Sequence, residues 1–158
     1  MSERYWYQNG GTVFKIVLVT AFIGFLGYSF RQQAQEEARP YVIPDVAANI
    51  NQPLFGSPSL VVTVWHTHTG VLRNGRLTVS ASGEMVETRS GFQSQSHSFE
   101  VWEPNRDRAV TLTFPLKHFD ATREIPISFT LIGQGIKPFA YSDAWLGNTW
   151  KSNKKASP

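Results

Sequence analysis

The chain has 158 residues, of which 41% are hydrophobic, 13% aromatic and 17% charged, and it contains no cysteine. This composition is too hydrophobic for a disordered chain, and the absence of cysteine excludes disulfide scaffolds, thiolate zinc sites, iron–sulfur clusters and cysteine nucleophiles. The formal net charge is +3, but three lysines among the last eight residues account for the excess: Lys151, Lys154 and Lys155. Because the excess lies in a tail and not on a face, we expect no nucleic-acid binding.

The N-terminal segment carries the strongest pattern. Residues 1–12 are predicted to be a tail with an interfacial aromatic belt at 5–7 and a polar spacer at 8–11. Residues 13–30 then read VFKIVLVTAFIGFLGYSF, with Lys15 as the single charge. A helix of this length spans about 27 Å, close to the hydrocarbon thickness of a bilayer. The pattern predicts a single transmembrane helix, whose expected anchoring residues are Lys15, Ile16, Phe22, Phe25, Tyr28 and Phe30.

Two alternatives to a retained anchor stay open. Residues 13–30 resemble the apolar part of a cleaved signal peptide, with Gly27 and Ser29 as small residues near a cleavage point, although bulky neighbours crowd it. A buried core helix is the second alternative, and apolar residues on all sides disfavour it. Arg4 and Lys15 precede the uncharged run 16–30 and Arg31 follows it, which slightly favours a cytoplasmic N-terminus. We therefore expect an extracytoplasmic C-terminal domain, periplasmic or at the cell surface.

Residues 31–58 are predicted to form a stalk or linker. The polar stretch 31–39 continues the helix for about two turns, until Pro40 and Pro44 stop it. Residues 40–46 suit an edge strand or an extended strap. Residues 47–58 are rich in turn-forming residues, so we expect irregular structure there.

Residues 59–150 read as β-strands. Segment 60–65 is apolar on both faces, as in a central strand. Asn74-Gly75 is the pattern of a type I′ hairpin turn, which would join 67–72 to 76–82. A short strand is predicted at 85–88 and a polar loop at 90–97. Further strands are expected near 98–103, 109–116 and 125–133, where apolar and polar residues alternate.

Six or seven strands at this spacing predict an all-β fold, an immunoglobulin/fibronectin-like β-sandwich that follows the transmembrane helix. A small barrel is the alternative. Residues 151–158 are predicted to be a basic, disordered tail.

The histidines are the most suggestive candidates for metal chemistry. In a strand, His66 and His68 would point to the same face, within reach of one copper or zinc ion. His97 and His118 would have to complete such a site, because zinc and copper need three or four ligands. The alternative is that the pair are rim residues at the end of a strand.

Aromatic residues crowd the C-terminal end of the domain: Phe139, Tyr141, Trp145 and Trp150. An exposed aromatic group marks a contact surface for a protein or a carbohydrate. The alternatives are that these side chains cover an open edge of the sandwich or lie near the bilayer surface.

The sequence carries no G-x-S-x-G elbow, no H-E-x-x-H motif and no glycine-rich phosphate loop. The leading hypothesis is thus a non-catalytic, single-pass membrane protein without a cofactor, whose sandwich binds a protein partner or supports complex assembly. Its partners would be the bilayer, through residues 13–30, and an unidentified protein. The competing hypotheses are a membrane-tethered module that handles copper or zinc through His66 and His68, and a small hydrolase.

Overall fold

A computed structural model describes residues 4–152, with side chains from residue 17 onward. The chain divides into two compact units at the boundary between Arg39 and Pro40. The first contains helix α1 (Arg4–Glu37). The second contains, in chain order, the strands β1 (Asp45–Asn51), β2 (Ser59–Trp65), β3 (Leu72–Ser82) and β4 (Phe92–Trp102), the 3₁₀ helix η1 (Arg106–Arg108), and the strands β5 (Val110–Pro115), β6 (Glu124–Gln134), β7 (Phe139–Leu146) and β8 (Thr149–Trp150).

Helix α1 is longer than the predicted apolar segment. It contains residues 13–30, it continues to Glu37 as expected, and it ends shortly before Pro40. Residues 8–11, predicted as a flexible spacer, also lie inside the helix. The helix therefore continues through two glycines, which cost about 1 kcal/mol each relative to alanine.

The structure does not confirm the predicted transmembrane span. Over the part of the chain whose side chains are described, no helix is long and apolar enough to cross a membrane. The uncharged apolar run that is described there, from Val17 to Phe30, amounts to only about 21 Å of helix, against about 30 Å of hydrocarbon. The first residues of the predicted span, 13–16, lie outside the described side chains, and Lys15 and Ile16 are among them.

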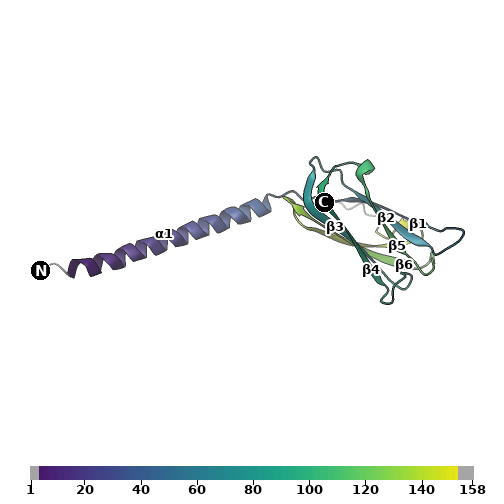
Figure 1. The fold of residues 1–158 in the computed structure, drawn as a ribbon, viewed down its shortest axis with the longest axis horizontal. Helices are drawn as coiled ribbons and strands as arrows, with labels where there is room; N and C mark the ends of the chain where they lie inside the picture. Colours follow the sequence, from purple (N-terminus) through teal and green to yellow (C-terminus); the bar gives the residue numbers. More distant parts are fainter. Residues whose placement is uncertain (1–3, 153–158) are drawn as a thin grey trace. The chain divides into compact units, whose positions relative to one another are not determined.

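The second unit is an all-β, sandwich-like fold made of two antiparallel sheets (Figure 1). One sheet has the strand order β1-β2-β5, and the other has the order β4-β3-β6-β7-β8. Strand β2 is central in its sheet, as its apolar pattern predicts. The all-β, sandwich-like part of the prediction is confirmed.

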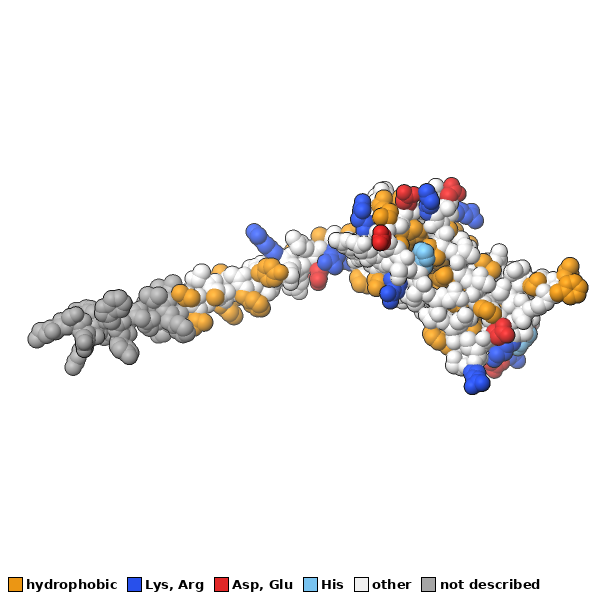
Figure 2. All heavy atoms as spheres, viewed as in Figure 1, with side chains coloured by type: hydrophobic (Ala, Val, Ile, Leu, Met, Phe, Trp, Pro, Cys, Tyr) orange, Lys and Arg blue, Asp and Glu red, His pale blue; other side chains and the backbone are white. Residues whose placement is uncertain are grey.

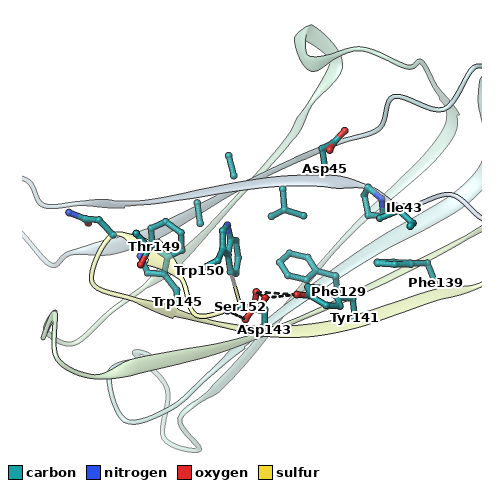
Figure 3. A pocket seen from close by; sticks show the side chains of 15 residues that line it. Ile43, Asp45, Phe129, Phe139, Tyr141, Asp143, Trp145, Thr149, Trp150 and Ser152 are labelled. Atoms are coloured by element: carbon teal, nitrogen blue, oxygen red, sulfur yellow. Dashed lines mark hydrogen bonds between the residues drawn. The ribbon is translucent and has the colours of Figure 1, made fainter. Parts of the chain in front are cut away.

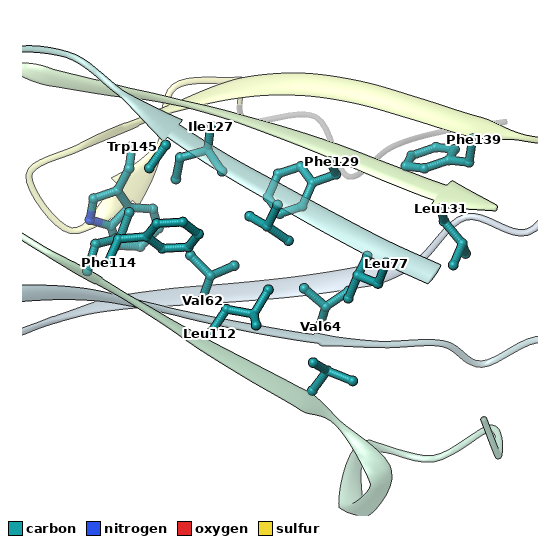
Figure 4. Packing of buried hydrophobic residues seen from close by; sticks show 14 of the residues in the cluster. Val62, Val64, Leu77, Leu112, Phe114, Ile127, Phe129, Leu131, Phe139 and Trp145 are labelled. Atoms are coloured by element: carbon teal, nitrogen blue, oxygen red, sulfur yellow. The ribbon is translucent and has the colours of Figure 1, made fainter. Parts of the chain in front are cut away.

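The core lies between the two sheets and follows the alternation in the sequence (Figure 4). Strand β5 buries Val110, Leu112 and Phe114 and exposes the residues between them. Each fully buried side chain of this kind contributes about 1.5–3 kcal/mol. Because a slip by one residue would turn this whole set toward water, burial also fixes the register of the strands.

The predicted hairpin at Asn74-Gly75 is wrong. Both residues lie inside β3, which runs unbroken from Leu72 to Ser82. The register with β6 shifts between Arg73 and Arg76, and Asn74 has a φ of 45°. The positive φ that suggested a turn therefore serves a β-bulge. Gly75 is required there because an added Cβ would lie 2.4 Å from the Phe99 ring and from a backbone oxygen of β6.

The segment 90–97 also differs from its prediction as a polar loop, because residues 92–97 belong to β4. Polar side chains hold this strand to β3: Thr78 Oγ1 lies 2.9 Å from Ser96 Oγ, and Ser80 donates to Ser94 at 2.9 Å. Cross-strand hydroxyl pairs of this kind stabilise the pairing of two strands on a polar face of the sheet. Residues 85–88 form no strand, and only an isolated bridge joins Val86 to Leu116.

The second unit, the β unit, begins earlier than expected, because residues predicted to form the stalk belong to it. Val42 is buried in the core, and β1 pairs with β2 along its full length. Pro40 accepts a backbone hydrogen bond from Lys137 at 3.0 Å. At the other end, Lys151 donates its backbone N–H to Ala144 at 2.8 Å, so the fold extends into the segment predicted as a tail. Residues 153–158 of that tail lie outside the described residues.

Candidate functional site

A groove opens on one side of the sandwich, between β1 on one sheet and β7 and β8 on the other (Figure 3). Its volume is about 660 Å³. Residues 43–48 form one wall, and the other wall comes from β6, β7 and β8 together with Asn148 and Ser152. All four aromatic residues predicted as a partner surface line this groove: Phe139, Tyr141, Trp145 and Trp150.

The groove exists because the two sheets differ in width. On one side of the sandwich β4 and β5 come together, and Gln95 Nε2 donates to the Thr113 carbonyl at 2.6 Å. The three-stranded sheet therefore ends at β1, while the five-stranded sheet continues through β7 to β8. Strands are about 4.8 Å apart, so the wider sheet extends about 10 Å beyond the narrower one.

The aromatic side chains form a continuous wall along this overhang. The ring centroids of Trp145 and Trp150 are 5.1 Å apart in a T-shaped arrangement, and Trp150 packs on Phe129 at 5.9 Å. Phe139 and Tyr141 continue the wall with centroids 6.3 Å apart. Phe139 and Trp145 are buried, whereas Tyr141 and Trp150 are half-buried and face the groove. The four aromatic residues thus both cover the open edge of the sandwich and line the groove, so the two interpretations do not exclude each other.

Asp143 holds the end of the fold against the groove wall. Its Oδ1 accepts the backbone N–H groups of Ala144 at 2.8 Å and of Ser152 at 3.2 Å. Its Oδ2 accepts the hydroxyls of Ser152 and, at 3.1 Å, Tyr141. These four hydrogen bonds occupy the acceptor sites of the carboxylate. Asp143 therefore acts as a clasp that joins β7 to Ser152, the second residue after β8.

The same hydrogen bonds set the ionisation of Asp143. Partial burial raises the pKa of its carboxyl, but the bonds from Ser152, the Ala144 amide and Tyr141 together outweigh burial and hold the pKa below its ordinary value. A carboxylate with a lowered pKa and no open acceptor site is a poor general base. Its contribution to the groove is a fixed negative charge.

The groove carries negative charge only. Asp45 lies at the start of β1, and Asp143 lies on the facing wall, while no lysine or arginine is among the described lining residues. Asp45 accepts one side-chain hydrogen bond, from the Thr67 hydroxyl at 3.2 Å, and keeps further acceptor sites open. A ligand with positive charge and apolar groups therefore matches this surface.

Two further exposed apolar residues were not predicted from the sequence as candidate contact residues. Leu54 and Phe55 lie in the loop between β1 and β2 and are 97% and 93% exposed. The signal was present, because Pro53, Gly56 and Pro58 mark a turn that leaves no strand to bury the two side chains. Exposed large apolar pairs of this kind mark contact surfaces.

The histidine pair has a different place from the one predicted. His66 continues the inward alternation of β2 into the core, where it is 0% exposed. Its Nε2 lies 3.0 Å from the Trp102 carbonyl, and its ring packs edge-to-face on the Trp102 indole. His68 is half-buried, and His97 and His118 are exposed. Among residues whose side chains are described, no three histidine or acidic residues gather closely enough to hold a metal ion.

The sequence matches no known protein-family model, and no curated protein matches it.

Proposed function

We propose that the protein is a non-catalytic, membrane-anchored binding protein, whose β unit holds a segment of a partner protein in the groove between β1 and β7. The observation that carries this proposal is the aromatic wall. Tryptophan and tyrosine are enriched among the few residues that contribute most of the binding energy at protein interfaces. The exposed Leu54-Phe55 loop follows directly from β1 and would supply a second contact.

An immunoglobulin/fibronectin-like fold is part of the proposal. The strand orders support it: β1-β2-β5 on one sheet and β3-β6-β7 on the other match the first, second and fifth and the third, sixth and seventh strands of that architecture. Fold alone assigns no activity. It does explain why the sheet edges, and not a central cavity, form the candidate surface.

The membrane anchor is proposed for residues 13–30, with an extracytoplasmic β unit. Val17, Leu18 and Val19 support it, because all three are more than half exposed although successive helix residues point about 100° apart. Figure 2 shows apolar side chains along the described part of the helix. Phe22, Phe25, Tyr28 and Phe30 of the predicted anchor are exposed as well. A helix that exposes apolar residues in every direction suits lipid better than a single protein groove.

The binding proposal is tested by site-specific photo-crosslinking in the native cell. A benzoylphenylalanine in place of exposed Asn148, at the groove, should give one discrete cross-linked protein, and the same probe in place of Val101, exposed on β4, should not. The double variant Leu54→Ser/Phe55→Ser should weaken the cross-link and leave the melting temperature unchanged, because both side chains are exposed. Equal cross-linking from both positions, or none from Asn148, would contradict the proposal.

The absence of cysteine allows a clean test of the anchor and of the topology. A single cysteine in place of Glu100, which is exposed on β4, should react with a membrane-impermeant maleimide in intact cells. The protein should also stay in the membrane fraction after alkaline carbonate extraction. Labelling only after permeabilisation would contradict the extracytoplasmic position, and release by carbonate would contradict the anchor.

A further inference from the structure

We infer that the groove takes its ligand by strand addition: an extended segment of the partner pairs with the free edge of β1 and places every second side chain against the aromatic wall. This inference rests on the binding function proposed above and states the chemistry of the ligand, an extended strand with alternating apolar residues and a basic residue next to Asp45.

The backbone of β1 has a free edge. In an antiparallel pair, alternate residues point both N–H and C=O toward the partner strand, so the other residues of β1 point theirs away from β2. Among the described residues, β1 pairs with β2 and with no other strand, and no other hydrogen bond reaches its backbone. The groove lies along this edge.

This edge lacks the features that normally prevent strand addition. Edge strands are usually protected by lysine, proline, a bulge or a covering segment. Strand β1 reads DVAANIN, and its register with β2 is continuous over seven residues. Its small residues Ala47 and Ala48 line the groove and leave room beside the strand.

The opposite wall has the right place and width for the added side chains. The wider sheet extends by about two strand spacings beyond β1, so one further strand beside β1 would cover β7. The edge of β7 is less accessible, because β8 pairs with Trp145 and Leu146 and the Asp143 clasp holds Ser152 against the strand. The free edge of β1 is therefore the one that accepts a strand.

Charge defines one end of the ligand. Asp45 begins β1, keeps open acceptor sites, and lies in a groove whose described lining contains no basic residue. In an antiparallel complex the residue opposite Asp45 is the last of the added segment, and the residues opposite Val46, Ala48 and Ile50 face the interior. A capped peptide of sequence Thr-Val-Thr-Val-Thr-Val-Lys has this pattern.

The test uses full-length protein in detergent micelles and this peptide, with binding followed by amide hydrogen exchange in β1. The parent peptide should bind with a Kd below about 1 mM and protect amides of β1. Two matched peptides carry N-methyl groups on the three valines or on the three threonines. Because only one set of N–H groups can face β1, one methylated peptide should bind at least about tenfold more weakly than the other.

The charge is tested by reversal. Replacing the peptide's lysine with glutamate should weaken binding about threefold, and Asp45→Lys should reverse this preference. Equal binding of the two methylated peptides, or no binding of the parent, overturns strand addition. Protection of β1 without peptide that increases with protein concentration would assign the edge to a second copy and overturns it as well. In each case a specific cross-link from Asn148 would leave the binding function standing.

Discussion

The hydroxyl of Ser152 donates to Asp143 Oδ2, and the backbone N–H of the same serine donates to Oδ1 of the same carboxylate. One side chain of β7 therefore fixes the second residue after β8. The short strand β8, which pairs with β7 at only two positions, depends on this clasp. Trp150 lies on β8, so the clasp also positions part of the aromatic wall.

Replacing Asp143 with asparagine should destabilise the β unit by about 2 kcal/mol, because an amide has one acceptor oxygen where the carboxylate accepts four hydrogen bonds. Urea unfolding followed by tryptophan fluorescence measures this change. Asp45→Asn is the matched control, since Asp45 accepts a single side-chain bond, and its stability should change by less than about 0.5 kcal/mol. Equal effects of the two variants would show that Asp143 is not a clasp.

Stability should fall in acid, in part because of Asp143. The hydrogen bonds hold its pKa in the folded protein below the unfolded value. Its contribution is therefore fully present above about pH 4 and is lost as the pH falls through the folded pKa. Unfolding free energies measured across this range should show a smaller slope for Asp143→Asn than for the natural protein. Some dependence of stability on pH should remain in the Asp143→Asn variant, because the hydrogen bonds from Thr122 lower the pKa of Asp120 as well.

His66 should give a second pH dependence at higher pH. Burial lowers the pKa of His66 and outweighs the hydrogen bond from Nε2–H to the Trp102 carbonyl, which raises it. The buried Nδ1 has no described partner that would accept a proton from the charged ring. The unfolded chain binds the proton more tightly, so stability should decrease as the pH falls below about 6.5. His66→Leu should remove this step from the unfolding free energy, whereas His68→Leu should retain it. A step that survives in His66→Leu would contradict this assignment.

Gly75→Ala should destabilise the fold by about 2 kcal/mol or more, because the new Cβ would clash with the Phe99 ring and with the Ile132 carbonyl. Thermal and urea unfolding of the variant measure the loss. Gly70→Ala is the control: its nearest neighbour would be 3.6 Å away, so the melting temperature should not change. A harmless Gly75→Ala would mean that the β3 bulge tolerates a side chain.

Alternation of apolar and polar residues was sufficient to predict β5 and β6, which carry part of the core. Val110, Leu112 and Phe114 on β5, and Ile127, Phe129 and Leu131 on β6, are buried as that pattern requires. The pattern failed where hydroxyl pairs replace apolar burial, as between Thr78 and Ser96. It also failed at Asn74, because a positive φ serves a bulge as well as a turn.

The candidate site was only half visible in the sequence. The four aromatic residues could be identified because they cluster near the C-terminal end, but the facing wall comes from β1, about 100 residues earlier in the chain. No local pattern reports the difference in width between two sheets. Similarly, Asp143 looked like one of several punctuating polar residues, and only the return of the chain at Ser152 reveals its hydrogen bonds.

The unprotected edge of β1 has a cost that affects every copy of the protein. Backbone groups that can receive a partner's strand can equally receive β1 of a neighbouring molecule, which is the first step of aggregation. A lysine in the middle of β1 would suppress both events together. Solubility and ligand recognition thus place opposite demands on the same few backbone amide groups of β1.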